Sequence, residues 1–210
     1  MKDIGVPWPG KGDKAFRNVP FSPTGANPGW LYHVSQMLSS DYDWAIAEGS
    51  KKAADRVVDS LAATKERVDV FFFPVVYLYR HAIELSLKGL VIDGVSLRIL
   101  ENGKELQDIL ASHNLHKLWG KVRLVLKTVW PDADDADLDA VEKIILEFHQ
   151  ADRTGQRLRY SKDKHGKSHV DTLPDRVDLV ELRRVMEGLF NFLGGCSAGL
   201  DEAKNWMNDH

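Results

Sequence analysis

The first segment of this chain whose residue types could support chemistry carries Arg80, Glu84 and Lys88. They are spaced four apart, so on a helix they form one charged row on an otherwise apolar surface. Ion pairing between Glu84 and its two neighbours would offset part of the cost of burial, which gives the row a structural role. Alternatively, an arginine on a rigid helix can hold a phosphate or carboxylate through two parallel hydrogen bonds. Both interpretations stay open at this point.

A second segment holds two histidines, His113 and His116, three residues apart at the start of a predicted helix. Capping or packing at the helix start is the simpler interpretation, and metal ligation is the alternative. Because no carboxylate motif such as HExxH accompanies the pair, we predict neither a metal site nor a cofactor. Cys196 lies among glycines and small residues without an evident histidine partner, which argues against a nucleophilic role.

A third segment places Arg159, Tyr160 and His165 among several lysines in a predicted loop. Six lysines and arginines lie between positions 153 and 168, where Asp163 is the only acidic residue. Phosphates could neutralise this excess of positive charge. Cleaving RNA without a metal requires a base for the 2′-hydroxyl, an acid for the leaving oxygen, and cations for the developing charge. Histidine and arginine can supply these roles. An exposed, charged hairpin without a catalytic role is the alternative.

The overall charge balance is close to neutral, with 28 lysines and arginines against 31 aspartates and glutamates. It predicts neither general nucleic-acid affinity nor its absence. A basic stretch from Lys117 to Lys127 and an acidic stretch from Asp132 to Glu142 are each also typical of solvated surface. A weaker functional alternative is an antitoxin-like or scaffold protein whose acidic stretch contacts a basic partner.

The elements that must position these residues are helical, and the predicted fold class is an all-α bundle of five to six helices. Residues 1–29 contain five of the eight prolines and are predicted to form an irregular arm, followed by one helical domain over 30–210. Apolar spacing predicts helices over Trp30–Leu38, Asp41–Leu61, Val68–Ile92, Leu115–Trp130, Leu138–Phe148 and Leu179–Met207.

Several boundaries follow from helix-breaking and capping residues. We expect breaks at Gly49-Ser50 and Gly194-Gly195, and a kink or a start at Pro74. Asp135 or Asp137 is the expected cap of the helix that follows. Residues 93–112 are expected to be a connection, and 158–170 a loop or short hairpin.

Cellular location is predicted from the chain start and from cysteine content. Residues 1–9 carry an acid and two prolines but no apolar stretch, and one cysteine allows no intramolecular disulfide. The longest apolar run, Val70–Tyr79, is too short to cross a bilayer. We therefore expect a cytoplasmic protein that does not span a membrane.

Three motifs together resemble the HEPN superfamily. They are the helix from Tyr77 to Leu90 with its Arg80-His81-x-x-Glu84-x-x-x-Lys88 pattern, the start His113-Asn114-Leu115 leading into Leu118-Trp119, and Leu158-Arg159-Tyr160. The similarity covers residues 70–195. It implies a dimerising bundle of four to five helices, which agrees with the periodicity. Many members are metal-independent ribonucleases of toxin, antiviral or RNA-processing systems, with an arginine and a histidine separated by four to six residues.

Arg159 and His165 have that spacing, with five residues between them. The family usually places the pair on a helix with a polar residue after the arginine, where Tyr160 stands here. The resemblance implies a homodimer that binds and cleaves RNA, with Arg159 stabilising phosphate charge and His165 or His113 as acid or base.

The remaining candidate site residues, Arg80, Glu84, Lys88 and Tyr160, would form the substrate pocket. The alternative that the resemblance also allows is a non-catalytic module that binds a nucleotide, RNA or a partner protein such as an antitoxin.

Overall fold

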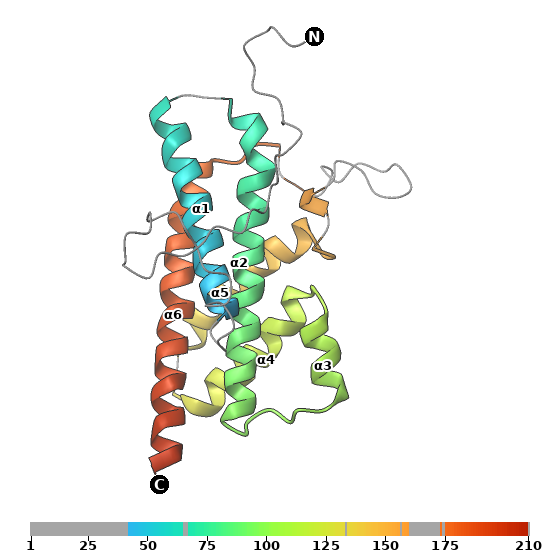
Figure 1. Cartoon of the computed structure of the whole chain (residues 1–210), viewed down its shortest axis with the longest axis vertical. Coiled ribbons are helices and arrows are strands. Elements are labelled where there is room, and N and C mark those ends of the chain that lie inside the picture. The colour runs from blue at the N-terminus through green and yellow to red at the C-terminus, as the bar shows by residue number, and fades with distance from the viewer. Residues whose placement is uncertain are drawn as a thin grey trace, which may run out of the picture. The chain divides into compact units, whose positions relative to one another are not determined.

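Six α-helices and one short 3-10 helix make up the part of the chain that the structure, a computed structural model, describes. The described residues are 42–64, 67–132, 134–155, 157–159, 173 and 175–209, all within one unit, residues 40–210. They contain no strand, so the prediction of an all-α bundle is confirmed (Figure 1). The elements are α1 Tyr42–Thr64, α2 Val68–Ser96, α3 Lys104–Ala111, α4 Leu115–Val129, α5 Asp135–Ala151, η2 Arg157–Arg159 and α6 Leu179–Asp209.

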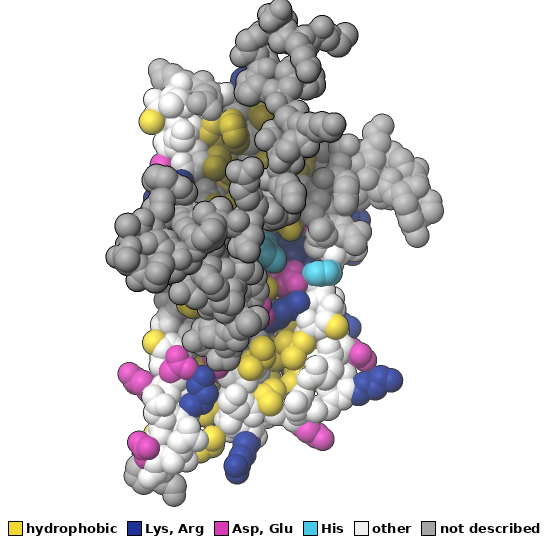
Figure 2. Space-filling model, in the orientation of Figure 1, with side chains coloured by type: hydrophobic (Ala, Val, Ile, Leu, Met, Phe, Trp, Pro, Cys, Tyr) yellow, Lys and Arg dark blue, Asp and Glu magenta, His cyan; other side chains and the backbone are white. Residues whose placement is uncertain are grey.

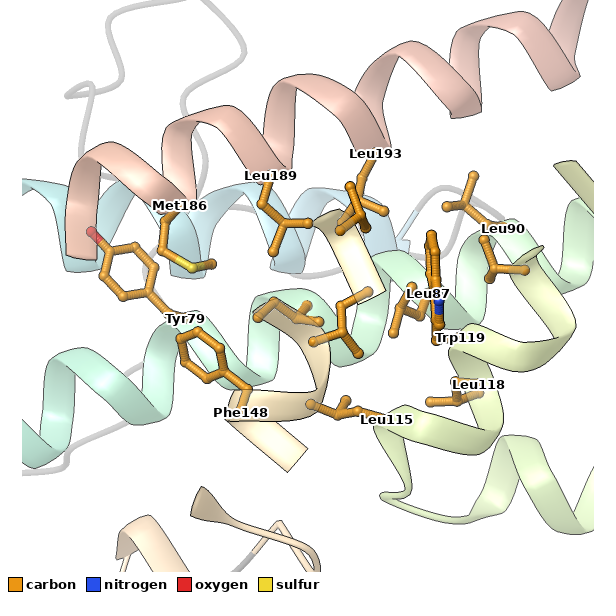
Figure 3. Packing of buried hydrophobic residues seen from close by; sticks show 14 of the residues in the cluster. Tyr79, Leu87, Leu90, Leu115, Leu118, Trp119, Phe148, Met186, Leu189 and Leu193 are labelled. Carbon is orange, nitrogen blue, oxygen red and sulfur yellow. The ribbon is translucent and has the colours of Figure 1, made fainter. Parts of the chain in front are cut away.

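Helix α2 is the centre of the bundle and packs against α1, α4, α6 and η2 (Figure 1). It is apolar nearly all round, as expected for a helix with neighbours on several sides. Figure 3 shows its Tyr79 near Met186 of α6 and its Leu87 beside Trp119 of α4, and all four side chains are buried. Each such apolar side chain contributes roughly 1.5–3 kcal/mol by leaving water, so this contact holds the bundle together.

The helix predicted over Leu115–Trp130 is confirmed as α4, Leu115–Val129. Its apolar side chains recur at helical spacing, and Pro131 follows its end. The cap of α5 was predicted wrongly. Asp134 is the N-cap, and its carboxylate accepts a hydrogen bond of 2.8 Å from the backbone N–H of Ala136. Asp135 and Asp137 lie in the first turn instead, where their charge favours the positive end of the helix.

Two predicted breaks are absent, since α1 continues through Gly49 and α6 through Gly194 and Gly195. Glycine inside a helix costs only about 1 kcal/mol relative to alanine. Buried apolar residues on both sides of each site, such as Leu193 and Leu200 in α6, offset that cost. Tertiary packing therefore overrides the local preference.

Of the two effects expected of Pro74, a helix start is excluded, because the proline lies inside α2. A connection was predicted wrongly at residues 104–111, which form helix α3. Helix α3 buries only Leu106 and Ile109, too few positions to establish a helical period in the sequence. The predicted arm, the helix over 30–38 and most of the 158–170 loop lie outside the described residues.

The acidic and basic stretches seen in the sequence contact each other. Arg123 of α4 forms ion pairs with Asp135, Asp139 and Glu142 of α5, at distances of 2.7–3.3 Å. Trp119 also donates to Glu142 through its indole N–H at 3.1 Å. Much of the charge in both stretches is therefore used inside the chain, to hold α4 against α5.

Helix α2 is also long and apolar enough, by length and composition, to cross a membrane. Central helices of soluble bundles pass the same test, and 56% of its most apolar window is buried among the neighbouring helices.

Gly94 is the position in α2 where a side chain would disturb the core. An added Cβ there would collide with Val125 of α4 and come within 3.1 Å of Leu100. We expect Gly94→Ala to lower the free energy of unfolding by about 1–3 kcal/mol, measured by urea unfolding. Gly89→Ala is the matched control: it lies on the same helix with open space around it and should stabilise the protein slightly. Equal effects of the two substitutions would contradict this account.

Candidate functional site

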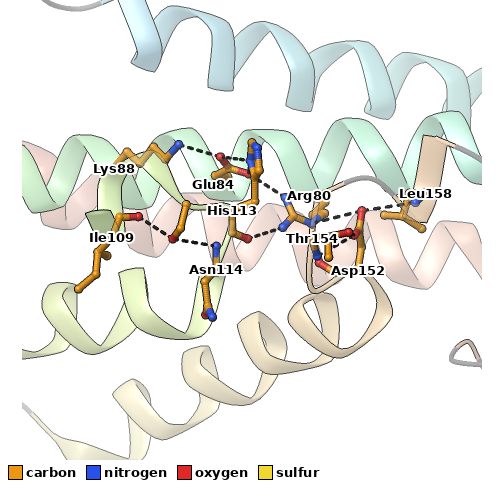
Figure 4. A network of polar contacts seen from close by, with 10 residues as sticks. Arg80, Glu84, Lys88, Ile109, His113, Asn114, Asp152, Thr154 and Leu158 are labelled. Atoms are coloured by element: carbon orange, nitrogen blue, oxygen red, sulfur yellow. Dashed lines mark hydrogen bonds and ion pairs between the residues drawn. The ribbon is translucent and has the colours of Figure 1, made fainter. Parts of the chain in front are cut away.

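A buried arginine, Arg80, joins three separate parts of the bundle. Its side chain is 2% exposed, and all three guanidinium nitrogens donate hydrogen bonds (Figure 4). Nε donates to the backbone oxygen of Asp152 at 3.1 Å, Nη1 to Glu84 at 2.8 Å and Nη2 to the backbone oxygen of His113 at 2.7 Å. Arg80 therefore ties α2 to the segment before α4 and to the end of α5.

Glu84, one turn further along α2, is the carboxylate at the centre of this network. It is buried, and it accepts from Arg80, from Lys88 at 2.8 Å, and contacts Nδ1 of His113 at 2.9 Å. Burial by itself would raise the pKa of Glu84, but the hydrogen bonds and charges of these partners outweigh it and lower the pKa to about 2. The carboxylate is thus charged at any physiological pH.

Asp152 closes the other side of the network and was missed in the sequence. Its fully buried carboxylate lies 3.7 Å from Nε of Arg80, and it accepts from the backbone N–H groups of Thr154 and Leu158 at 3.2 and 3.4 Å. These bonds fix the turn that follows α5. An aspartate just after a helix with a threonine two residues on is a signal for such a turn, so the sequence contained a clue.

Gly155, within this turn, lies directly against the ring of His113. It has φ of +72°, and a Cβ added to it would come within 3.0 Å of Cγ of His113. Glycine fits both the backbone conformation and the close approach. The turn therefore holds the histidine ring from one side, and Glu84 holds it from another.

His113 is the member of the network that solvent can reach, since its side chain is 49% exposed. It precedes α4, whose N-cap Asn114 accepts from the backbone N–H of Lys117 at 3.0 Å. With Nδ1 bonded to a permanently charged carboxylate, Nε2 is the ring nitrogen left to exchange a proton with a ligand. A histidine oriented by a carboxylate in this way can act as a general acid or base.

The structure brings together four of the predicted site residues, Arg80, Glu84, Lys88 and His113. Figure 2 shows histidine, acidic and basic side chains side by side on one face of the molecule. Because every nitrogen of Arg80 is engaged inside the protein, the geometry gives the charged row its structural interpretation. His113 and, to a smaller extent, Lys88 are the groups that face outward.

The remaining predicted residues are placed less fully. Arg159 belongs to η2, which packs against α2, and only its backbone is described. Tyr160 and His165 lie outside the described residues. Cys196 is half-buried, and burial raises the pKa of its thiol to about 11, which suits packing rather than nucleophilic attack.

His116 does not join His113, and its ring lies 6.2 Å from that of His149 in α5. Within the described part of the chain, no group of three or more histidine, cysteine or acidic side chains could hold a metal ion.

One further histidine, His81 of the Arg80-His81 motif, was not assigned a site role from the sequence. His81 precedes Glu84 by three residues on α2, so the two share a helix face, and its ring stacks on Tyr77 with centroids 6.0 Å apart. Burial lowers the pKa of His81, while the charge of Glu84 partly opposes that effect. In the sequence, the signal that could have drawn attention to His81 is its position three residues before the candidate acid Glu84.

Comparison of the chain with protein-family models, curated proteins and solved structures finds no match.

The lowered pKa of Glu84 predicts acid sensitivity. The unfolded carboxyl titrates near 4.5 and the folded one near 2, so the unfolded state binds the proton more readily. The stabilisation is therefore complete above pH 4.5 and is lost as the pH falls towards 2. It amounts to on the order of 3 kcal/mol, at roughly 1.4 kcal/mol for each pKa unit. Urea unfolding between neutral and acidic pH measures it.

Glu84→Gln should remove this part of the pH dependence and cost about 3–5 kcal/mol at neutral pH, because the buried Arg80 loses the nearer of its two carboxylate partners. Glu105→Gln, at an exposed ion pair on α3, is the control and should change little. Should Glu84→Gln fail to fold, a carboxyl NMR titration of the unaltered protein decides the matter. A midpoint near 4.5 for Glu84 would contradict the network described above.

The close approach of Gly155 to His113 predicts that a side chain at position 155 would move the histidine ring. Gly155→Ala should displace the ring of His113 and cost about 1–3 kcal/mol, because alanine strains the positive φ and crowds the ring. Histidine NMR spectra should show a shifted His113 signal, whereas Gly120→Ala, at an open helical position, should leave it in place. An unmoved His113 signal in Gly155→Ala would show that the turn does not position the ring.

Proposed function

We propose that this chain is a HEPN-like protein that binds RNA and cleaves it without a metal ion. The observation that carries the proposal is the half-exposed His113, whose Nδ1 lies 2.9 Å from the buried, charged carboxylate of Glu84. A rigid carboxylate–histidine pair at the surface is what proton transfer to or from a substrate requires. The proposal also depends on the resemblance described from the sequence.

The reaction needs only groups that this chain contains. A base removes the proton of a ribose 2′-hydroxyl, the 2′-oxygen attacks the adjacent phosphorus, and the bond to the 5′-oxygen breaks as an acid protonates that oxygen. The products carry a 2′,3′-cyclic phosphate and a 5′-hydroxyl. In this proposal His113 is one of the two proton-transfer groups, and cations stabilise the charge of the intermediate.

The other roles are assigned to Arg159, the last residue of η2, and to Tyr160 and His165, which follow it in the sequence. Arg159 would stabilise the phosphate charge, His165 would be the second proton-transfer group, and Tyr160 would line the pocket. Lys88 adds a cation beside His113, since both contact Glu84. Arg80 and Glu84 act as positioning residues because they are buried and bonded to each other.

The proposal includes a homodimer, as the resemblance implies, with symmetry-related sites near the dimer cleft. It also includes the cytoplasmic location that the cysteine content and the chain start predict. Toxin or antiviral defence is the context that the resemblance suggests, and an antitoxin is then the partner protein.

The test is incubation of the purified full chain with labelled single-stranded and structured RNA in excess EDTA. We expect cleavage with cyclic-phosphate ends, and His113→Gln should slow it by about 10²–10⁴-fold, the usual contribution of a general acid or base. The double variant Arg159→Ala, His165→Ala should be equally impaired. Arg56→Ala, at an exposed position on α1, is the control and should cleave normally.

Thermal unfolding of each variant shows whether it is folded, and His113→Gln should fold because its side chain is half-exposed. Full activity in His113→Gln would contradict its role. Binding of RNA without cleavage by any form of the protein would favour the non-catalytic module.

A further inference from the structure

A second pair of histidines lies close to the His113 site. His116 is exposed in the first turn of α4, one turn after His113, and His149 is in the last turn of α5. Their ring centroids are 6.2 Å apart, with an angle of 41° between the ring planes. Arg153, also exposed, follows the end of α5 two residues before Gly155, which touches the ring of His113.

Positive groups surround His149 on several sides. Burial lowers the pKa of His149 most, and the charges of His116, Arg153 and Arg80 lower it further, while Asp152 opposes them. Asp152 is itself fully buried and is committed to Arg80 and to the turn. Of these groups, His116 and Arg153 are exposed and His149 is half-buried. Arg153 is cationic, and an imidazole becomes cationic on protonation.

Glu147 precedes His149 by two residues, a spacing that does not place two side chains on the same face of α5. Other acids of the two helices are absent near the cluster or engaged elsewhere. The first turn of α4 holds no acidic residue. Asp135, Asp139 and Glu142 of α5 pair with Arg123 further along α4. Nδ1 of His149 is buried and has no hydrogen-bond partner among the described residues. Like charges held together in this way would be stabilised by an anion, which would accept their hydrogen bonds.

We propose that His116, His149 and Arg153 form a binding site for a phosphate group. An imidazolium pair and a guanidinium provide several donors on one side, which matches the several acceptor oxygens of a phosphate. A divalent metal ion would be repelled by the arginine and would find no carboxylate facing it from this cluster. The class of ligand is therefore a phosphate ester.

The natural ligand that we infer is a phosphodiester of single-stranded RNA, lying next to the bond that the His113 site cleaves. This identification depends on the proposed function, whereas phosphate binding does not. The position supports it, because His116 lies one helical turn from His113 and Gly155 connects the cluster to the same ring. The site would hold the RNA backbone without reading its sequence.

The direct test is an NMR titration of the histidines of the full chain with inorganic phosphate, against chloride at equal ionic strength. Phosphate should raise the pKa of His149 by about one unit, as expected for an opposite charge nearby, and should move the NMR signals of His116. Arg153→Ala should weaken phosphate binding by about tenfold, equivalent to about 1.4 kcal/mol. Arg56→Ala, the same charge removal on α1, should leave it unchanged. Equal histidine pKa values in phosphate and chloride would overturn the proposal.

A second measurement identifies the ligand. The affinity of each protein for a short oligouridylate is measured in EDTA. The double variant His116→Gln, Arg153→Ala should bind the oligouridylate at least about tenfold more weakly than the unaltered protein does. The control variant Arg56→Ala should bind it as tightly as the unaltered protein. Phosphate binding without RNA binding would keep the phosphate site and reject its RNA ligand. RNA binding that depends on this cluster, without cleavage, would keep the inference and reject the ribonuclease. Undiminished RNA binding in the double variant would reject the cluster as an RNA site.

Discussion

The burial of one guanidinium group constrains the rest of this structure. Arg80 lies in the middle of an apolar helix and would be costly there without partners. Its three nitrogens meet a carboxylate of its own helix and backbone oxygens from two distant segments. Each of those segments must keep its position for the charge to stay compensated. The turn after α5 and the start of α4 are therefore held where they are by the same group.

This constraint also explains how a rigid surface site can arise. The strongest interactions, between Arg80, Glu84 and Asp152, are inside the protein and exclude solvent. His113 receives its orientation from them, through its backbone oxygen and its Nδ1, while its ring stays half-exposed. A charge placed outside the bundle would instead be screened by water and would hold a histidine less firmly. The buried network thus favours positioning, and in the function that we propose proton transfer is the role of His113 at its edge.

Some of the charged side chains on the surface around His113 form ion pairs within the fold, and others do not. Ion pairs between α4 and α5 use the acids at one end of these helices. At the other end, His116 and Arg153 are exposed and His149 is half-buried, near a fully buried aspartate. The acidic and basic stretches of the sequence pair with each other, whereas His116, His149 and Arg153 lie outside both stretches and close to His113. That asymmetry supports ligands that carry phosphate.

The sequence by itself determined the helices whose apolar residues repeat over many turns, α2 and α4 above all, and the common face of Arg80, Glu84 and Lys88. Helical periodicity is a local property, so a local pattern is sufficient to predict it. Tertiary structure decided that α1 and α6 continue through their glycines and that Arg80 is enclosed. Its partner Asp152 is 72 residues away in the chain, and no periodicity links two such positions. Packing against other helices determines those contacts, because the free energy of burial exceeds the small local preferences of single residues.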